Sequence, residues 1–263
     1  MSTVVGIDAG GTKLAAARVD TATGALTERR VIATPTAAGG SAVLGACLSL
    51  ARTLGPGATG IGVPEVVDGT GRIRSAANWD WRDVDLSTAF SAVGSVHVVS
   101  DVYAAALAEA RFGAGRDAGS FLYVSVGTGI SSTLVINGRP WAGADGRAIL
   151  LGAPLVEDVA SGPALARVAG ATSAEAAFAD PAATSVVAAA AAALGLELAR
   201  IVHATDPGLI VLGGGLGLVA RYRALVAAAI ASTIDSTYAV MPTVVPAALG
   251  ADAGVIGAAL ATG

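Results

Sequence analysis

The chain has 263 residues, of which 54% are hydrophobic and 14% charged, and its formal net charge is −4. This length suffices for a large core in one broad unit or two lobes, and the negative charge argues against nucleic acid as the main partner. A single cysteine, Cys47, permits neither an internal disulfide nor a zinc site built from cysteines.

We expect no membrane span and no signal peptide. Asp8 interrupts the only apolar stretch near the start, and no basic region precedes it. No segment is expected to reach the ~18 strongly apolar residues that cross a bilayer. The Ala-rich run over 186–194 suits a buried or amphipathic helix, because Glu197 and Arg200 follow it closely. These features predict a soluble cytoplasmic protein whose partners are small molecules.

The first expected element is a hairpin over residues 4–19, in which a buried strand ends at Asp8. Its turn contains Gly10, Gly11, Thr12 and Lys13. Backbone N–H groups of such a turn can wrap an anion, Thr12 adds a hydroxyl, and Asp8 can hold a hydrated magnesium ion. Asp8 also suits simple turn initiation, and Lys13 can either reach a phosphate or face solvent.

The next elements alternate between helix and strand. The expected order is a helix over 41–54, a short buried strand over 61–63, a hairpin turn at 69–71, a buried strand over 96–99 and a helix over 102–112. Asp101 lies one residue past the second of these strands. Open α/β sheets bind ligands beyond the carboxyl ends of their strands. Asp101 can therefore serve as a catalytic base, as a helix cap, or as both.

A second glycine hairpin follows over residues 121–136 and leads to a turn at 137–138. Its turn consists of Gly127, Thr128 and Gly129. Two glycines flanking a threonine weaken the end of a buried strand, so their presence there suggests a function. Two phosphate-type hairpins on two apolar strands indicate two related lobes that close on a nucleotide from opposite sides.

The remaining chain continues the alternation. We expect helices over 163–168, 174–179 and 182–204, a strand over 209–212, a helix over 218–234, a strand over 243–246 and a helix over 252–261. The glycines after the first of these strands are Gly213, Gly214 and Gly215. They form either a tight strand-to-helix turn or a surface against which a flat base or ribose can lie. This alternation predicts α/β layers with mixed sheets.

Taken together, these motifs resemble the ROK family of sugar kinases and repressors, within the actin/hexokinase/Hsp70 superfamily. The matching segments follow the family's order and are residues 4–13, 61–64, 75–81, 100–106, 206–215 and 251–259. The resemblance implies a two-lobed α/β fold of the actin-like ATPase and ribonuclease H-like kind, with mixed sheets and a cleft between lobes. It places one lobe at 1–101 plus about 248–263 and the other at 102–247.

The resemblance also implies roles for individual residues. ATP with Mg²⁺ is the expected phosphate donor, with Asp8 near the metal and both glycine turns on the phosphates. Asp101 is the expected catalytic base, and Gly213 to Gly215 are expected to bind adenosine. A homodimer is the implied assembly, and neither a membrane nor nucleic acid is an expected partner.

Several positions depart from the family pattern. Leu150 and Ala153 stand where a sugar-binding Glu and a His are expected, and the zinc loop with three cysteines is absent. We therefore expect no structural zinc. Glu157 keeps the position of the last sugar carboxylate, and Glu65 replaces the second glycine of a GxPG loop. Ser100 replaces an Asn before the catalytic Asp and is expected to contact the substrate. We expect a rebuilt acceptor pocket that disfavours glucose, because unpaired buried hydroxyls cost about 1–3 kcal/mol.

Three substrate-side features each allow two interpretations. Glu65 can bind an amine or a different hydroxyl pattern, or it can be a loop charge that points outward. Asn78 can bind a hydroxyl or cap a turn. Trp79 and Trp81 can line a polyol face or fill the core.

The sequence predicts an ATP-dependent kinase that phosphorylates a primary hydroxyl of a cyclic polyol. The acceptor classes considered are a modified hexose, an amino sugar and a C7-cyclitol. The alternative is a non-catalytic sensor or pseudokinase that binds sugar or nucleotide without turnover. Because the first phosphate strand begins at Val4, we expect no helix-turn-helix and hence no DNA-binding repressor. Asp8, Asp101 and the glycine turns are all present, which favours changed specificity over lost activity.

Overall fold

The computed structural model describes residues 3–149 and 154–263, which form two compact units. The first unit contains Met1–Phe112, Pro140–Ala148 and Ala251–Gly263, and the second contains Gly113–Arg139 and Ile149–Gly250. The first unit extends past the boundary expected at residue 101. The reason is that helix α3 (Asp101–Phe112) packs along helix α10 (Ala253–Leu260), which lies on the first sheet.

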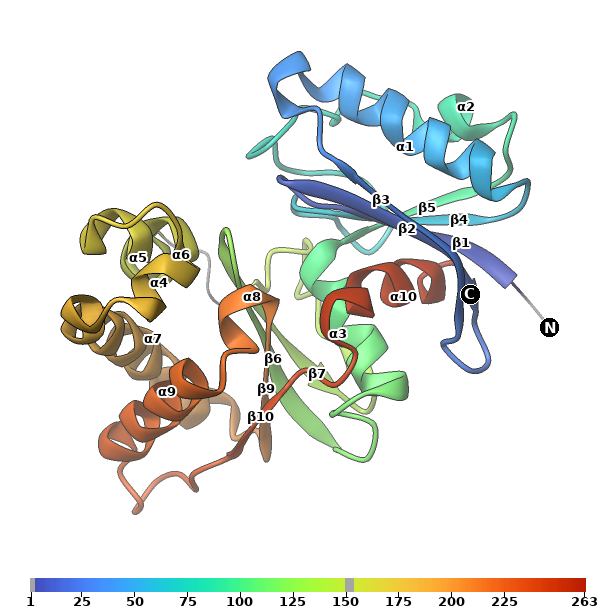
Figure 1. Ribbon diagram of the computed structural model, residues 1–263. Helices are drawn as coiled ribbons and strands as arrows, with labels where there is room; N and C mark the ends of the chain where they lie inside the picture. The colour runs from blue at the N-terminus through green and yellow to red at the C-terminus, as the bar shows by residue number, and fades with distance from the viewer. Residues whose placement is uncertain (1–2, 150–153) are drawn as a thin grey trace. The chain divides into compact units, whose positions relative to one another are not determined.

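A five-stranded sheet forms the centre of the first unit, with the order β3-β2-β1-β4-β5 (Figure 1). Its strands are β1 (Thr3–Ala9), β2 (Lys13–Asp20), β3 (Leu26–Ala33), β4 (Thr59–Val63) and β5 (Val96–Ser100). Strand β2 is antiparallel to β1 and β3, whereas β1, β4 and β5 run parallel. Apolar side chains of β1, β2 and β4 are almost entirely buried, which explains why these strands could be predicted.

Strand β3 was not predicted. Seven of its eight residues are exposed, and its middle is the polar run Thr27 to Arg30. An edge strand of this kind has no alternation of apolar and polar side chains, so its position is set only by pairing with β2.

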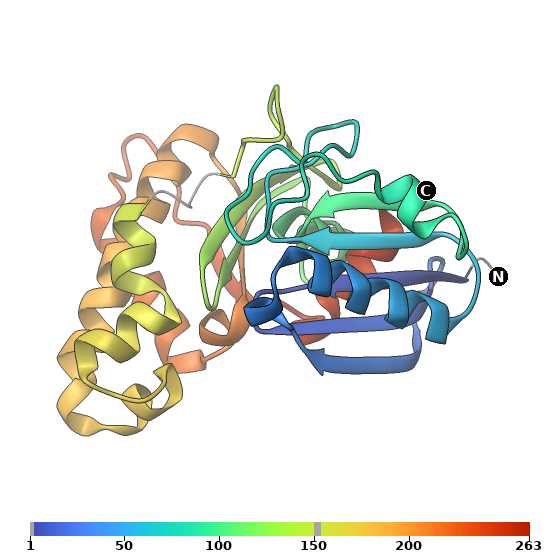
Figure 2. The same ribbon diagram turned by 90° about the horizontal axis from the view of Figure 1, so that it is seen from above.

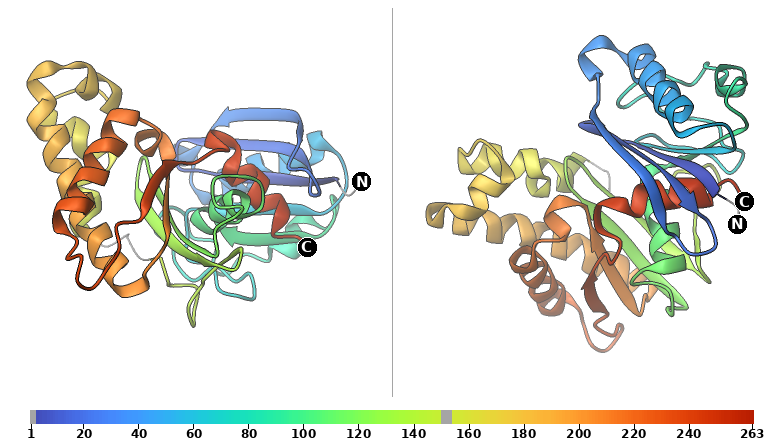
Figure 3. Two further views of the ribbon diagram at one scale, coloured as in Figure 1. Left: turned by 90° about the horizontal axis from the view of Figure 1, so that it is seen from below. Right: turned by 45° about the vertical axis from the view of Figure 1, so that its right-hand side comes forward.

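Helices cover both faces of this sheet. Helix α1 (Gly40–Leu54) lies along one face (Figure 2), where Val43, Cys47 and Leu50 join the core. Helices α3 and α10 lie side by side on the other face (Figures 1 and 3). The remaining helical segments are the short α2 (Leu86–Phe90) and the 3-10 turns η1 (Thr36–Ala38) and η3 (Gly250–Asp252).

The second unit has its own five-stranded sheet with the order β10-β9-β6-β7-β8. Its strands are β6 (Ser120–Val126), β7 (Ile130–Ile136), β8 (Arg139–Pro140), β9 (Leu209–Gly213) and β10 (Thr243–Pro246). Strands β6 and β7 form the expected antiparallel hairpin, and β6, β9 and β10 run parallel. Asn137 and Gly138 have φ angles of 51° and 75°, as the two-residue turn after β7 requires.

The helical segments of the second unit pack mainly on one side of its sheet (Figure 1). They are α4 (Pro154–Ala160), α5 (Gly162–Ala169), α6 (Ala174–Ala179), η2 (Pro181–Ala183), α7 (Thr184–Thr205), α8 (Gly214–Gly217) and α9 (Ala220–Thr233). The core between helices and sheet includes Leu122, Val124, Leu194, Leu198 and Tyr222. The expected α/β class with mixed sheets is confirmed in both units.

The expectation that no segment is long and apolar enough to cross a membrane is wrong for one helical stretch. Residues 181–205 meet the length and composition of such a span, because alanine counts as apolar. Eight residues of α7 are nevertheless buried, among them Val187, Leu194 and Leu198 in the core of the second unit. A core helix of a soluble protein has the same composition, so this one stretch is weak evidence for a membrane.

Candidate functional site

Three parallel strands of the first unit bring polar residues to one edge of the sheet. The register pairs Asp8 of β1 with Gly62 of β4, and Val63 of β4 with Ser100 of β5. Asp8 and Asp101 therefore lie at the carboxyl ends of β1 and β5, the two strands that flank β4. This is the place where open α/β sheets bind their ligands.

Asp101 begins helix α3, and its Oδ1 accepts a hydrogen bond from the backbone N–H of Val102 at 2.6 Å. Burial and the nearby carboxylate of Asp8 raise the pKa of Asp101 to about 7, and the charge of Glu65 acts in the same direction. A carboxylate with a pKa near neutrality is suited to accepting a proton from an alcohol. The backbone bond at the helix start is compatible with this role, so the two interpretations of Asp101 do not compete.

Asp8 lies at the end of β1, where burial raises its pKa to about 6 and the Lys13 ammonium partly opposes this shift. Helix α10 approaches its carboxylate closely at Gly254. A methyl group at Gly254 would lie 2.5 Å from Oδ2 of Asp8, so a glycine is needed there. This glycine belongs to the segment 251–259 that resembles the ROK family, but its spacing gave no sign of the contact with Asp8.

The first glycine turn is held by a residue that sequence reasoning missed. Thr34, which follows β3, donates from Oγ1 to the carbonyl of Gly10 at 2.6 Å and from its backbone N–H to the carbonyl of Thr12 at 3.1 Å. The N–H of Gly10 donates to the carbonyl of Lys13 at 3.1 Å. Gly11, Thr12 and Lys13 are exposed, which leaves this turn open to a ligand.

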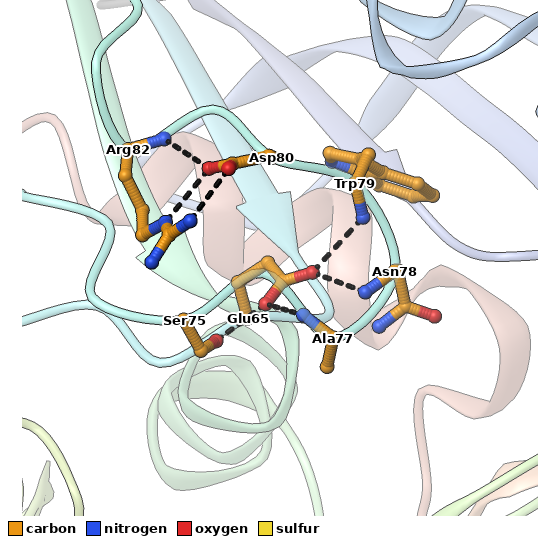
Figure 4. Close-up of polar contacts among 7 residues, drawn as sticks. All are labelled: Glu65, Ser75, Ala77, Asn78, Trp79, Asp80 and Arg82. Atoms are coloured by element: carbon orange, nitrogen blue, oxygen red, sulfur yellow. Dashed lines mark hydrogen bonds and ion pairs between the residues drawn. The ribbon is translucent and has the colours of Figure 1, made fainter.

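The acceptor-side residues of the first unit differ in exposure. Glu65 is 3% exposed and Ser100 is 1% exposed, whereas Asn78 is exposed. Glu65 is therefore not the outward-pointing charge of one interpretation, because its carboxylate is bonded to the segment 75–79 (Figure 4). Ser100 is buried at the end of β5, and this does not favour the direct substrate contact expected for it.

Trp79 and Trp81 belong to the hydrophobic core of the first unit. Their ring centroids are 5.5 Å apart, and Nε1 of Trp81 donates to the carbonyl of Gly40 at 3.0 Å. These contacts favour the core-packing interpretation over a polyol-lining role.

Two glycine turns come together within the second unit. A methyl group at Gly127 would lie 3.8 Å from the backbone nitrogen of Gly215, which places the two turns beside each other. Gly214 has a φ angle of 73°, and a methyl group there would overlap the carbonyl of Val126. Glycine is thus required at Gly214, while Gly215 faces open space.

Glu157 of α4 contacts the turn at Gly127 to Gly129. Its Oε2 accepts a hydrogen bond from the backbone N–H of Ile130 at 2.8 Å, and a methyl group at Gly129 would lie 2.9 Å from the same oxygen. One carboxylate oxygen therefore supports the second phosphate-type turn, a contact that the resemblance did not suggest. Leu150 and Ala153, the expected replacements for a sugar-binding Glu and His, lie outside the described residues.

Magnesium fits the carboxyl ends of the strands through Asp8. Within 3–149 and 154–263, no three His, Cys, Asp or Glu side chains gather as a ready metal ligand set. Mg²⁺ commonly binds through one or two carboxylates, substrate phosphates and retained water. A single carboxylate beside an open glycine turn is consistent with that mode.

Each unit contains a mixed sheet. In each, the first two strands along the chain are joined by a glycine turn and run antiparallel to each other. Together with the carboxylates at the strand ends, these elements are typical of α/β proteins that bind phosphate groups. The family model described as the ROK family matches residues 4–262. The chain belongs to the ROK family, as the sequence motifs predicted.

Known proteins of this family resemble this chain along nearly its whole length. The chain is 34% identical to the bifunctional enzyme NanE/NanK of Brucella melitensis over 98% of its own length and 53% of that enzyme, so it spans about half of this relative. Among solved structures, the ROK hexokinase from Thermus thermophilus is 33% identical with a TM-score of 0.80, covering 99% of this chain and 97% of that one. The ROK family glucokinase from Streptomyces griseus, solved with glucose and AMPPNP, is 28% identical with a TM-score of 0.82 and 98% coverage of both chains.

Proposed function

We propose that the chain is an ATP-dependent kinase that phosphorylates a primary hydroxyl of a sugar-like cyclic polyol. The observation that carries this proposal is Asp101, a carboxylate with a pKa near neutrality beside Asp8 at the ends of parallel strands. The family's hexokinase and glucokinase members, and the ATP analogue bound to one of them, support the same reaction class.

In this reaction Asp101 accepts the proton of the acceptor hydroxyl while that oxygen bonds to the γ-phosphorus of ATP. The bond from the γ-phosphorus to its bridging oxygen breaks, and ADP leaves with the electron pair. Magnesium, held through Asp8, would neutralise charge on the phosphates. The turns at 10–13 and 127–129 donate backbone N–H groups to phosphate oxygens, and Gly213 to Gly215 leave room for adenosine.

The acceptor pocket is proposed to disfavour glucose. Leu150 and Ala153 carry neither the acceptor nor the donor that a Glu and a His would offer to ring hydroxyls. Asn78 and Glu157 remain as the polar residues proposed to contact the acceptor. A modified hexose, an amino sugar or a C7-cyclitol with a primary hydroxyl is therefore the proposed substrate class.

The test is an ATP-consumption screen with purified protein and magnesium. The acceptor panel contains glucose, mannose, glucosamine, N-acetylmannosamine and C7-cyclitols, with a no-acceptor control. We expect turnover with at least one modified acceptor and a lower kcat/KM with glucose. ATP binding without turnover on any acceptor would favour a pseudokinase or sensor instead, and preferred use of glucose would contradict the proposed pocket.

Glu157 offers a paired prediction. Glu157→Gln should raise the acceptor KM by about tenfold or more, because a hydrogen bond to a charged group is worth about 1.5–3 kcal/mol. Its amide oxygen can still accept from the N–H of Ile130, so the KM for ATP should stay nearly constant. Glu157→Ala removes that acceptor and should raise both constants. Steady-state kinetics in both substrates check this, and unchanged constants in both variants would show that Glu157 has neither role.

We also propose that the protein is a cytoplasmic homodimer. We further propose that it holds no structural zinc, since the loop with three cysteines is missing from the sequence. Elemental analysis and light scattering test these two properties. One tightly held zinc per chain, or a monomer at working concentration, would contradict the respective proposal.

A further inference from the structure

Glu65 is a carboxylate that is buried in a loop of the first unit. It follows β4 and is 3% exposed. A buried charge is tolerated only when hydrogen bonds replace its lost hydration. The partners of Glu65 are therefore informative about its role.

Residues 75–79 donate four hydrogen bonds to this carboxylate. Oε2 accepts from Oγ of Ser75 and from the N–H of Ala77 at 2.8 Å, and Oε1 accepts from the N–H groups of Asn78 at 2.6 Å and Trp79 at 3.2 Å (Figure 4). A carboxylate offers about four lone-pair positions. These four bonds occupy them, so Glu65 has no acceptor position left for a substrate hydroxyl.

The three consecutive N–H groups converge as in a backbone nest that binds an anion. Here the anion is a side chain of the same chain. Ser75 is fixed in turn, because its Oγ accepts from the N–H of Val66 at 2.8 Å. A glycine at position 65, as in the GxPG loop that the sequence resembles, would leave these donors without the carboxylate.

The fixed segment determines how Asn78 is presented. Nδ2 of Asn78 donates to the carbonyl of Pro64 at 2.8 Å. Oδ1 then faces the first glycine turn, since a methyl group at Gly11 would lie 3.8 Å from it. The side chain of Asn78 is exposed, so its carbonyl oxygen is available as an acceptor beside the phosphate-type turn.

We propose that Glu65 is a positioning residue for the acceptor site, because its carboxylate holds residues 75–79 in the conformation that presents Asn78. This inference rests on the proposed function, in which Asn78 contacts the acceptor hydroxyls. Glu65 acts through the loop and does not touch substrate.

The decisive variant is Glu65→Ala, assayed in steady state with varied acceptor and varied ATP. We expect the acceptor KM to rise about tenfold or more, with kcat and the KM for ATP within about twofold of wild type. Formate or acetate should lower the raised KM by occupying the vacant nest. The matched control is Asp68→Ala, which removes a carboxylate that holds the neighbouring turn through Thr70, Arg72 and Arg74. This control should leave the acceptor KM unchanged.

A double-mutant cycle tests whether Glu65 acts through Asn78. In an Asn78→Ala background, Glu65→Ala should add less than about twofold, because coupled residues are not additive. An unchanged acceptor KM in Glu65→Ala, or full additivity with Asn78→Ala, would overturn the inference. If Glu65→Ala does not fold, Ser75→Ala removes one of the four bonds and should give a smaller rise in the acceptor KM, whereas no rise would count against the inference.

Hydrogen exchange separates this inference from the proposed function. Amides of residues 77–79 should exchange slowly in wild type and at least about tenfold faster in Glu65→Ala, as expected when hydrogen-bonded N–H groups lose their acceptor. If wild type phosphorylates no acceptor, the proposed function fails, while this exchange measurement still tests the anchoring. Equal exchange in both proteins would overturn it.

Discussion

Asp101→Asn is expected to lower kcat by about 10²–10⁴-fold, the usual contribution of a positioned general base. The amide cannot take the proton of the acceptor hydroxyl, but it keeps the size of the side chain and can still accept from the N–H of Val102. ATP affinity should therefore stay within a few-fold of wild type. Single-turnover phosphoryl transfer and ATP titration measure the two quantities separately.

The matched control is Asp68→Asn, a change of the same chemistry in a loop carboxylate of the same unit that touches none of the proposed site residues. It should leave kcat nearly unchanged. Turnover of Asp101→Asn within about tenfold of wild type, on the acceptor found by the screen, would remove Asp101 from the role of base.

Because the pKa of Asp101 is raised, Asp101→Asn should also change how the stability of the protein depends on pH. Its folded-state pKa of about 7 lies above the ordinary value of 3.8, so the folded protein binds more protons than the unfolded chain between these values. The stability of the metal-free protein should therefore fall as pH rises from about 4 to 7 and level off above 7. Asp101→Asn should weaken this decline and raise the melting temperature at pH 8. An identical pH dependence in both proteins would show that burial does not raise this pKa.

Gly257→Ala is expected to destabilise the first unit by about 1–3 kcal/mol or more, as overpacking of a close contact does. A methyl group at Gly257 would overlap the carbonyl of Ala104 in α3. Helix α10 cannot move away freely, because Gly6 and Gly60 bring strands β1 and β4 against the backbone of α10 at Val255 and Ala258. The contact is between backbones, so no side-chain rotation relieves it.

The control is Gly45→Ala in α1, where a methyl group meets nothing within 4 Å. An alanine in a helix interior is favoured over glycine by about 0.5–1 kcal/mol, so this variant should be slightly more stable than wild type. Thermal and urea unfolding compare the two variants. Because α10 also contacts Asp8 at Gly254, a shifted helix in Gly257→Ala should reduce turnover as well. Equal stability of Gly257→Ala and Gly45→Ala would contradict the close contact.

Much of the fold was predictable because local patterns record burial. Strands β1, β4 and β6 are apolar runs that end in carboxylate or glycine turns, and helix α1 has apolar residues at helical spacing. The ROK motifs then gave the family and the α/β class. Strand β3 escaped prediction because an exposed edge strand carries no period-two pattern.

The individual site contacts came from tertiary structure. Asp8 and Asp101 are recognisable in the sequence because each stands at the carboxyl end of an apolar strand, but their proximity and raised pKa values depend on the parallel register of β1, β4 and β5. Thr34 and Gly254 carry no local signal, since each acts on a turn or carboxylate that is distant in the chain.

Glu65 shows most clearly what the sequence determines and what only the tertiary structure decides. The sequence determined that a carboxylate stands where a glycine is expected, and it left open whether that charge meets substrate or solvent. In the structure the carboxylate faces neither, because it accepts hydrogen bonds from residues 75–79. Residue type and spacing determined the family, the strands and the chemical groups available to this protein. Only the packing of distant segments decided which of those groups are buried, which are paired, and which remain free to meet a ligand.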